Sequence, residues 1–368
     1  MKRLFKLDIL LPWAALAVMA GCAHRVPAVA VEAAPVAHIV PLPRSLETRP
    51  GTLRIAAAVA VEDAGAAPMA RRALDELLAT LDIANADTGT PLRLQRVDDA
   101  ALGEEGYRLV VDDAIHLSAR TDAGLLHAVQ SLRQLLPAGA GPAYRVPRLA
   151  ITDVPAYRWR GLSLDVARSF LPVDYLERHI DRMALFKMNR LHLHLTDDQG
   201  WRIEIKRYPR LVEIGGASAV QGGRAGYYTQ AQLKHLVAYA QVRGVTLVPE
   251  IDMPGHVQAA LASYNALACD DVANRGTYSG VEVGFSVLCL DKPDVVYPFV
   301  RDVLEEVVAI FPSAEIHIGG DEIRHPLYAG FVARTAAMVE AMGRRPIVWE
   351  EGSVADLQPG ALLQLWND

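Results

Sequence analysis

The sequence predicts an α/β protein: a TIM-type (β/α)8 barrel, with about six of its eight strand-helix units present, preceded by a small α+β domain. Beyond Pro155, short apolar runs alternate with amphipathic stretches of helical spacing, which indicates parallel strands joined by crossover helices. Polar residues cluster at or just after the end of most of these runs. Because the C-terminal ends of barrel strands converge on one face, this placement favours a barrel over a flat sheet with one switch point.

The expected elements follow from the spacing of apolar residues. In the first domain we expect β-like segments at residues 53–61, 106–111 and 114–118, and helices at 67–81 and 122–136. In the barrel we expect strands at 161–166, 190–195, 245–251, 315–319, 346–349 and 361–366, with helices at 173–186, 230–243, 295–311 and 327–342.

The chain divides into four expected segments: a lipoprotein signal peptide at 1–22, a linker at 23–40, the α+β domain at 41–150 and the incomplete barrel at 151–368. The signal has basic residues, then an apolar run, then Ala20-Gly21-Cys22, which resembles a bacterial lipobox. We therefore expect lipidation of Cys22 and an exported protein anchored at the membrane, facing the periplasm or the cell surface. A plain secretory signal and a short membrane anchor are the alternatives, although Pro12 and the short run disfavour a span.

Composition narrows the class of partner. A hydrophobic content of 51% is that of a packed globular protein, and a net charge of -6 offers no broad cationic surface for a phosphate backbone. We therefore expect no nucleic-acid partner, and contact with the membrane only through the lipid anchor. The sequence leaves the oligomeric state open.

Asp321 and Glu322 follow a buried strand and two glycines, so both carboxylates are expected on a pocket floor. Two neighbouring like charges raise one of the two pKa values, which suits a general acid. In ordinary retaining glycoside hydrolysis the two carboxyls flank the scissile bond about 5–5.5 Å apart, which a sequential pair rarely achieves. A substrate whose own 2-acetamido oxygen is the nucleophile removes that requirement. A capping aspartate followed by a surface glutamate is the structural alternative.

Three long motifs in order resemble family 20 glycoside hydrolases, the β-N-acetylhexosaminidases: Leu191-His-Leu-His-Leu-Thr-Asp-Asp-Gln-Gly-Trp-Arg202, Pro249-Glu-Ile-Asp-Met-Pro-Gly-His256 and His317-Ile-Gly-Gly-Asp-Glu322. The resemblance continues through residues 159–168 and 226–229 and covers essentially everything after Pro155. Segments 106–109 and 131–135 resemble, less specifically, the smaller N-terminal domain of that family. The resemblance implies cleavage of terminal β-linked GlcNAc or GalNAc with retention through an oxazolinium intermediate, and no cofactor. It implies a small oligosaccharide or glycoconjugate substrate, chitooligosaccharides among them.

The resemblance also implies roles for individual residues. Glu322 would be the general acid and base, and Asp321 would position the acetamido group and stabilise the intermediate. The remaining implied residues are Arg168 on the sugar hydroxyls, Trp349 and Trp366 as walls of the acetamido pocket, and Asp197 and His256 as residues that orient the catalytic pair. An ordinary ion pair for Arg168, loop caps for Asp197 and His256, and buried barrel tryptophans are the structural alternatives.

Two other functions fit parts of the pattern. His192 and His194, followed by Asp197 and Asp198, suggest a metal-dependent hydrolase. Alternate residues on a strand share a face, so a buried, hydrogen-bonded histidine pair is the favoured interpretation and no metal is expected. A non-catalytic sugar-binding protein or inactive fragment of the same fold is the second alternative, disfavoured by the presence of both Asp321 and Glu322.

Cys269 and Cys289 bracket an excursion just after the second motif, and export would take them to an oxidising compartment. We therefore expect a disulfide, with two buried free thiols as the alternative. The pattern contains no seventh or eighth strand unit after Trp366. An unclosed barrel exposes strand edges, so the sequence-based expectation is a poorly soluble polypeptide at least ~10²-fold less active than a full-length relative.

Overall fold

A computed structural model describes residues 38–63, 67–137, 139, 141, 143–270, 272 and 275–366. All of them fall within one compact unit, Pro35–Asp368. The predicted signal peptide with Cys22, and most of the predicted linker, lie outside the described residues. Within the described part of the chain, no helix is both long enough and apolar enough to cross a membrane.

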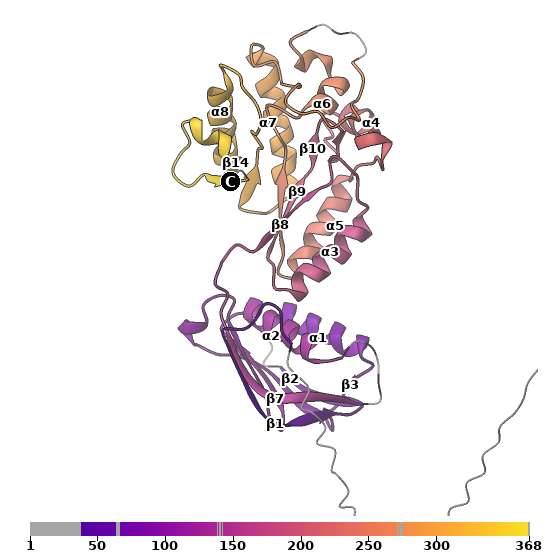
Figure 1. Cartoon of the computed structure of the whole chain (residues 1–368), viewed down its shortest axis with the longest axis vertical. Helices are drawn as coiled ribbons and strands as arrows, with labels where there is room; N and C mark the ends of the chain where they lie inside the picture. The colour runs from indigo at the N-terminus through magenta and orange to yellow at the C-terminus, as the bar shows by residue number, and fades with distance from the viewer. Residues whose placement is uncertain are drawn as a thin grey trace, which may run out of the picture. The chain divides into compact units, whose positions relative to one another are not determined.

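The first domain is a seven-stranded mixed sheet with two helices, α1 and α2, on one face (Figure 1). The strand order is β1-β7-β5-β6-β4-β2-β3. Alternate residues of β5 and β6 are buried, as expected for strands that pack one face on a helical layer. The elements are β1 Ser45–Ile55, β2 Ala58–Asp63, α1 Pro68–Thr80, β3 Ala84–Asn85, β4 Thr90–Arg96, β5 Tyr107–Val111, β6 Ile115–Ala119, α2 Asp122–Leu135 and β7 Tyr144–Asp153.

The structure corrects the first domain in three places. The single β-like segment expected at 53–61 is two strands, because β1 pairs antiparallel with β7 whereas β2 pairs parallel with β4. Ala56 and Ala57 between them are both exposed, which breaks the alternation of buried and exposed residues. Strands β3, β4 and β7 were not predicted, and β7 runs to Asp153, past the boundary expected at 150.

The six barrel strands predicted from the sequence are confirmed. They form one parallel sheet in the order β15-β14-β13-β12-β9-β8. Helices α3, α5, α7 and α8 follow successive strands, as a (β/α)8-type fold requires. The bounds are β8 Gly161–Asp165, α3 Val173–Leu185, β9 Arg190–His194, α5 Gln230–Gln241, β12 Thr246–Glu250, α7 Pro293–Ile310, β13 Glu315–His317, α8 Tyr328–Ala341, β14 Arg345–Trp349 and β15 Leu362–Gln364.

Shorter elements lie between these units: β10 Thr196–Asp197 pairs with β11 Gly200–Trp201, and two short helices are α4 Arg210–Glu213 and α6 Gln258–Ser263. The central strands β9, β12 and β13 are buried along almost their whole length, which requires mainly apolar residues on both faces. Five ionisable residues break that rule: His192, His194, Glu250, Glu315 and His317. Glu315 begins β13, whereas His194, Glu250 and His317 are the last residues of their strands, so most of this buried polar chemistry lies toward the C-terminal ends.

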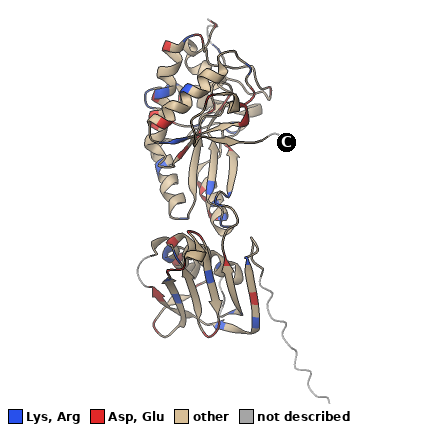
Figure 2. Ribbon diagram, turned by 90° about the vertical axis from the view of Figure 1, so that its left-hand side faces the viewer, with Lys and Arg blue, Asp and Glu red and all other residues tan. Residues whose placement is uncertain are grey.

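Acidic and basic residues are interspersed along the ribbon in the view of Figure 2. Several pair one helical turn apart, as Arg71 does with Asp75 and Arg178 with Asp174. Residues of opposite charge therefore lie next to each other on these helices.

Candidate active site

The turn that carries the two predicted catalytic carboxylates depends on glycine. Gly319 and Gly320 leave β13 with φ of 69° and 103°, values that L side chains rarely adopt. A Cβ on Gly319 would stand 1.7 Å from Asp252 Oδ1. The Gly320 N–H donates to that same oxygen at 3.0 Å. Glu322 also has positive φ, 57°, so the backbone is strained at the residue predicted to be the general acid.

Asp321 and Glu322 meet at one imidazole. His256 Nε2 lies 3.6 Å from Asp321 Oδ2 and 3.4 Å from Glu322 Oε2. The imidazole is fully buried, whereas the two carboxylate side chains are 18% and 30% exposed. The two carboxyl groups therefore lie on the same side of the site, reachable by a ligand and backed by a buried base.

The other ring nitrogen of His256, Nδ1, faces a second pair of carboxylates. This nitrogen lies 3.4 Å from Asp197 Oδ1 and 3.8 Å from Asp198 Oδ2. Burial by itself lowers the pKa of His256, but Asp197, Asp321 and Asp198 together outweigh it, so the pKa is raised. The predicted positioning residues Asp197 and His256 thus contact each other, and His256 contacts the carboxylate pair.

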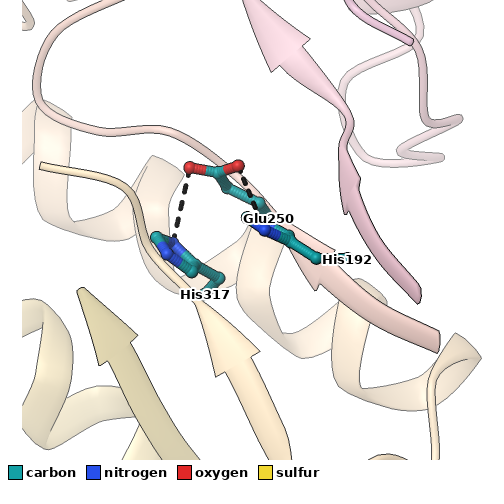
Figure 3. A group of neighbouring side chains, drawn as sticks. All are labelled: His192, Glu250 and His317. Atoms are coloured by element: carbon teal, nitrogen blue, oxygen red, sulfur yellow. Dashed lines mark hydrogen bonds and ion pairs between the residues drawn. The ribbon is translucent and has the colours of Figure 1, made fainter. Parts of the chain in front are cut away.

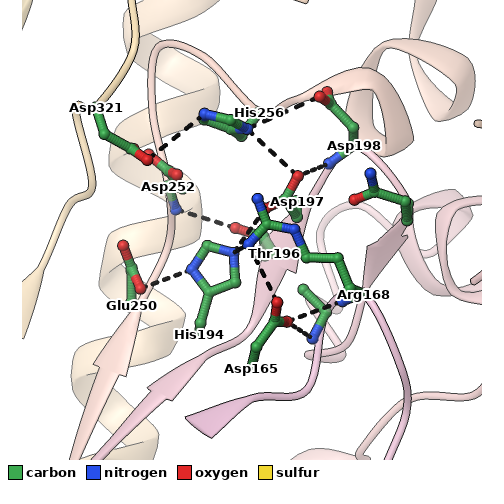
Figure 4. A network of polar contacts seen from close by, with 12 residues as sticks. Asp165, Arg168, His194, Thr196, Asp197, Asp198, Glu250, Asp252, His256 and Asp321 are labelled. Atoms are coloured by element: carbon green, nitrogen blue, oxygen red, sulfur yellow. Dashed lines mark hydrogen bonds and ion pairs between the residues drawn. The ribbon is translucent and has the colours of Figure 1, made fainter. Parts of the chain in front are cut away.

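Arg168, three residues after the end of β8, contacts two carboxylates, those of Asp165 and Asp197 (Figure 4). Its Nη2 lies 2.8 Å from Asp197 Oδ2, and its Nη1 donates to Asp165 Oδ2 at 3.1 Å. Asp165 Oδ1 in turn accepts the backbone N–H groups of Ala167 and Arg168, both at 2.9 Å. Burial lowers the pKa of Arg168, but Asp197 and Asp165 more than compensate and raise it. About a third of the side chain stays exposed, so donors remain for a ligand.

Asp252 is a buried carboxyl group that the sequence analysis did not single out. It lies beside Asp321, and its backbone N–H donates to Thr196 Oγ1 at 3.0 Å. Burial first, then the charges of Asp321 and Glu250, raise the pKa of Asp252 well above its ordinary value. A raised pKa favours the neutral form of Asp252, which places less negative charge next to Asp321 than a second ionised carboxylate would.

The two tryptophans predicted to wall the acetamido pocket differ in their contacts. Trp349 ends β14, donates from Nε1 to Glu250 Oε1 at 2.8 Å, and its ring centroid is 4.8 Å from that of His317. Trp366 is 48% exposed, and among the described residues its indole nitrogen bonds to Glu351 at 3.2 Å. The structure therefore joins Trp349, but not Trp366, to the buried polar network.

The structure favours hydrogen bonding over metal binding for the histidine pair. His192 Nε2 and His194 Nδ1 both approach Glu250 Oε2, at 2.8 and 2.7 Å, so the two histidines are linked through Glu250 (Figure 3 shows His192). The His317 Nδ1 accepts the Gly319 N–H at 3.0 Å, and burial lowers the pKa of His317 to about 3. A nitrogen that donates to a carboxylate has no free lone pair for a cation, but the same imidazoles and carboxylates also lie close enough together to act as ligands in other protonation states.

Arg202, at the end of the first motif, was also missed as a functional residue. It is completely buried, and its guanidinium donates to the carbonyl oxygens of Val166, Ala167, Gly216, Ser218 and Gly226. Burial lowers its pKa to about 10. One side chain therefore fixes the backbone just before Arg168 to the loop at 215–226. An arginine directly after an apolar Gly-Trp pair was the sequence signal.

The structure places Cys269 and Cys289 in a disulfide. The loop they bracket is tied to the site by Ser286, whose hydroxyl accepts the Val257 N–H at 2.8 Å and bonds to Asp198. Gln199 Nε2 also donates to the Gly280 carbonyl oxygen at 3.0 Å. The loop therefore lies against the residues behind His256.

These features are those of a class: a glycoside hydrolase on a (β/α)8-type fold, with paired carboxylates and a partly exposed arginine close to the strand ends. Comparison with known families makes the assignment specific. Residues 157–328 match the catalytic domain of glycosyl hydrolase family 20, and residues 36–154 match domain 2 of the same family. The chain belongs to glycosyl hydrolase family 20.

Individual relatives agree with that assignment. A beta-N-acetylhexosaminidase from Cellulomonas fimi is 40% identical over 343 residues, which are 89% of this chain and 69% of the relative. A beta-hexosaminidase from Porphyromonas gingivalis is 35% identical over 90% of this chain but 47% of its own length. The solved GH20 beta-N-acetylhexosaminidase of Streptomyces coelicolor A3(2) has a TM-score of 0.82 and 42% identity, covering 89% of this chain and 69% of that one. A mutant Streptomyces plicatus beta-hexosaminidase in complex with its product GlcNAc has the same TM-score and identity, covering 90% and 69%.

Proposed function

We propose that this chain is a retaining exo-β-N-acetylhexosaminidase that releases terminal GlcNAc or GalNAc by substrate-assisted catalysis. One observation carries the mechanism: Asp321 and Glu322 both approach the single nitrogen His256 Nε2, at 3.6 and 3.4 Å. Two carboxyls on one side of a pocket cannot flank the scissile bond, as an enzymic acid and an enzymic nucleophile must. The nucleophile is then supplied by the substrate.

In the proposed first step, the acetamido carbonyl oxygen attacks the anomeric carbon from within the substrate. The bond to the leaving oxygen breaks as Glu322 donates its proton to that oxygen, and a cyclic oxazolinium forms. Asp321 accepts a hydrogen bond from the acetamido N–H and balances the developing positive charge. In the second step Glu322 removes a proton from water, which attacks the same carbon and reopens the ring. Two inversions give retained configuration.

The surrounding residues support the two carboxylates in this scheme. His256 presents Nε2 to both of them and is held at Nδ1 by Asp197, 3.4 Å away. Its raised pKa favours an imidazolium that stabilises the Glu322 carboxylate after proton transfer. Arg168, braced by Asp165 and Asp197, offers its remaining donors to sugar hydroxyls. Trp349, with Trp366, is proposed to wall the acetamido group.

The direct test is turnover of aryl N-acetyl-β-glucosaminides and their galacto epimers by Glu322→Gln and Asp321→Asn variants. We expect each variant to lose at least the ~10²–10⁴-fold typical of general acid-base catalysis. The loss in Glu322→Gln should be smaller for activated leaving groups, which need little protonation. Glu213→Gln, an exposed carboxylate on α4, is the matched control and should keep wild-type turnover. Near-normal turnover in either catalytic variant would refute the assignment, and sugar affinity without turnover in the wild type would identify a non-catalytic binding protein.

A second measurement separates substrate assistance from an enzymic nucleophile. Thiazoline mimics of the cyclised intermediate should inhibit strongly, because they resemble the species that the site is proposed to stabilise. Weak inhibition, together with trapping of a sugar on a protein carboxylate, would contradict the mechanism while leaving the hydrolase assignment intact.

We also propose that the protein acts outside the cytoplasm, anchored through a lipid on Cys22. The signal-like N-terminus supports this, and the Cys269–Cys289 disulfide is of the kind found in oxidising compartments. Fractionation of cells with mass analysis of the N-terminal peptide tests it, and an unprocessed N-terminus in the soluble cytoplasmic fraction would contradict it.

A further inference from the structure

A buried histidine outside the proposed catalytic pair connects the two sides of the site. His194, near the end of β9, is 7% exposed. Its Nδ1 lies 2.7 Å from Glu250 Oε2, and its Nε2 lies 2.8 Å from Asp197 Oδ2. His194 thus links a carboxylate on β12 to the carboxylate that holds Arg168 and His256 (Figure 4).

The geometry fixes the protonation of this ring. A carboxylate oxygen at hydrogen-bond distance needs a donor opposite it, and both ring nitrogens of His194 face one. A neutral imidazole has only one N–H, so one of the two contacts would set a lone pair against a negative charge. Two N–H groups satisfy both contacts, and the ring is then an imidazolium.

The carboxylates on either side of His194 are themselves ionised by their surroundings. Glu250 is fully buried, and its oxygens also face His192 Nε2 and Trp349 Nε1, each at 2.8 Å. Burial alone would raise the pKa of Glu250, yet His194 first, and then His317 and His192, lower it well below the ordinary range. Asp197 has a lowered pKa for the same reason, since the contacts with His194, His256 and Arg168 outweigh its burial.

Asp197 is the point at which His194 acts on the site. One oxygen, Oδ2, is shared by His194 Nε2 and Arg168 Nη2, both at 2.8 Å. The other, Oδ1, accepts the Asp198 N–H at 2.5 Å and faces His256 Nδ1 at 3.4 Å. The orientation of this carboxylate therefore determines both where the Arg168 fork points and which oxygen faces His256 Nδ1.

We propose that His194 is a positioning residue that stays protonated. It is held by Glu250 and fixes the orientation of the Asp197 carboxylate. Asp197 in turn orients Arg168 toward the sugar and His256 toward Glu322. The proposal rests on the proposed function and extends it to residues that touch no substrate. The charged and titratable groups that face His194 are Asp165 and Arg168 at and just after the end of β8, Asp197 on β10, Glu250 and Asp252 at and just after the end of β12, and the neighbouring His192 and His317. Among them, Glu250 and Asp197 carry charges opposite to those of His194 and Arg168, which stabilises a protonated His194.

The chain contains a matched control for testing this proposal. His192 lies on the same strand, bonds to the same Glu250 oxygen and is equally buried, but Asp197 faces His194 instead. His194→Gln and His192→Gln both remove an imidazole from Glu250, and only His194→Gln breaks the connection to Asp197. Comparable thermal unfolding of the two variants would show that general destabilisation does not explain a difference in kinetics.

We expect His194→Gln to lower kcat/KM at least ~10²-fold, the scale of a small misplacement of groups in a site, with a rise in KM as well as a fall in kcat. His192→Gln should lose about tenfold or less. If His194 acts through Asp197, adding His194→Gln to Asp197→Asn should cost little more than Asp197→Asn alone. Equal losses in the two histidine variants, or additive losses in the double variant, would overturn the proposal.

A measurement on the unaltered protein covers the case in which His194→Gln fails to fold. Nitrogen-15 spectra of labelled and assigned histidines should show that the His194 imidazole remains doubly protonated between about pH 5 and 8. A His194 ring that is neutral in that range would also overturn the proposal. Failure of the proposed function itself would be seen first and separately, as absence of turnover by the wild-type chain.

Discussion

The substitution Arg202→Lys keeps the positive charge, yet it should destabilise the barrel strongly. The guanidinium donates through Nε, Nη1 and Nη2 to five backbone carbonyl oxygens, with donor-acceptor distances from 2.6 to 3.2 Å. The ammonium of Arg202→Lys has three donors on one atom, so at least two of these carbonyls lose their partner. Each buried polar group left unpaired costs about 1–3 kcal/mol, which puts Arg202→Lys at roughly 2–6 kcal/mol.

That loss is large against the ~5–15 kcal/mol that stabilises an ordinary domain. Urea unfolding followed by fluorescence would measure it as a lower midpoint, with Arg301→Lys on α7 as the control, since the Arg301 side chain is 55% exposed. Because Arg202 holds the carbonyls of Val166 and Ala167, just before Arg168, sugar affinity should fall as well. A change of less than ~0.5 kcal/mol in Arg202→Lys, the range of ordinary surface substitutions, would refute this account.

Two further predictions follow from the loop and the turn at the site. Cys289→Ser should lower the free energy of unfolding by about 3 kcal/mol according to the loop-closure model, and recovery of both cysteines alkylated from unreduced wild-type digests would contradict the bridge itself. Gly319→Ala should abolish turnover, because its Cβ would meet Asp252 Oδ1 at 1.7 Å at a residue with φ of 69°. Gly330→Ala on α8, where a Cβ meets nothing within 4 Å, should be neutral or slightly stabilising, and active Gly319→Ala enzyme would show that the turn tolerates a side chain.

The barrel could be predicted strand by strand because its central strands are buried on both faces and stand out as apolar runs. The first domain was harder. Its two strands β1 and β2 are separated by only two exposed alanines, and in β4 the two buried leucines, Leu92 and Leu94, alternate with charged or polar residues. Which strand pairs with which, parallel or antiparallel, depends on contacts far apart in the sequence.

The candidate site, like the fold, could be predicted from the sequence only in part. Asp321, Glu322, Arg168, Asp197 and His256 were predicted, and the structure brings them together. Polar residues at strand ends can be found without coordinates, because that is where parallel strands present side chains to a common face. Trp366 was grouped with them on the resemblance alone, and its indole bonds to Glu351 instead.

The amino-acid sequence by itself determined the order of strands and helices in the barrel and the strand ends that carry carboxylates, and its adjacent acids suggested the substrate-assisted mechanism proposed above. The tertiary structure decided what those residues contact. His194 and Glu250 are 56 residues apart and Arg168 and Asp197 29 apart, yet all four form one buried charge network. Burial is the physical reason: an ionised side chain inside a barrel is tolerated only where partners of opposite charge surround it, and those partners come from neighbouring strands, not from neighbouring positions in the sequence.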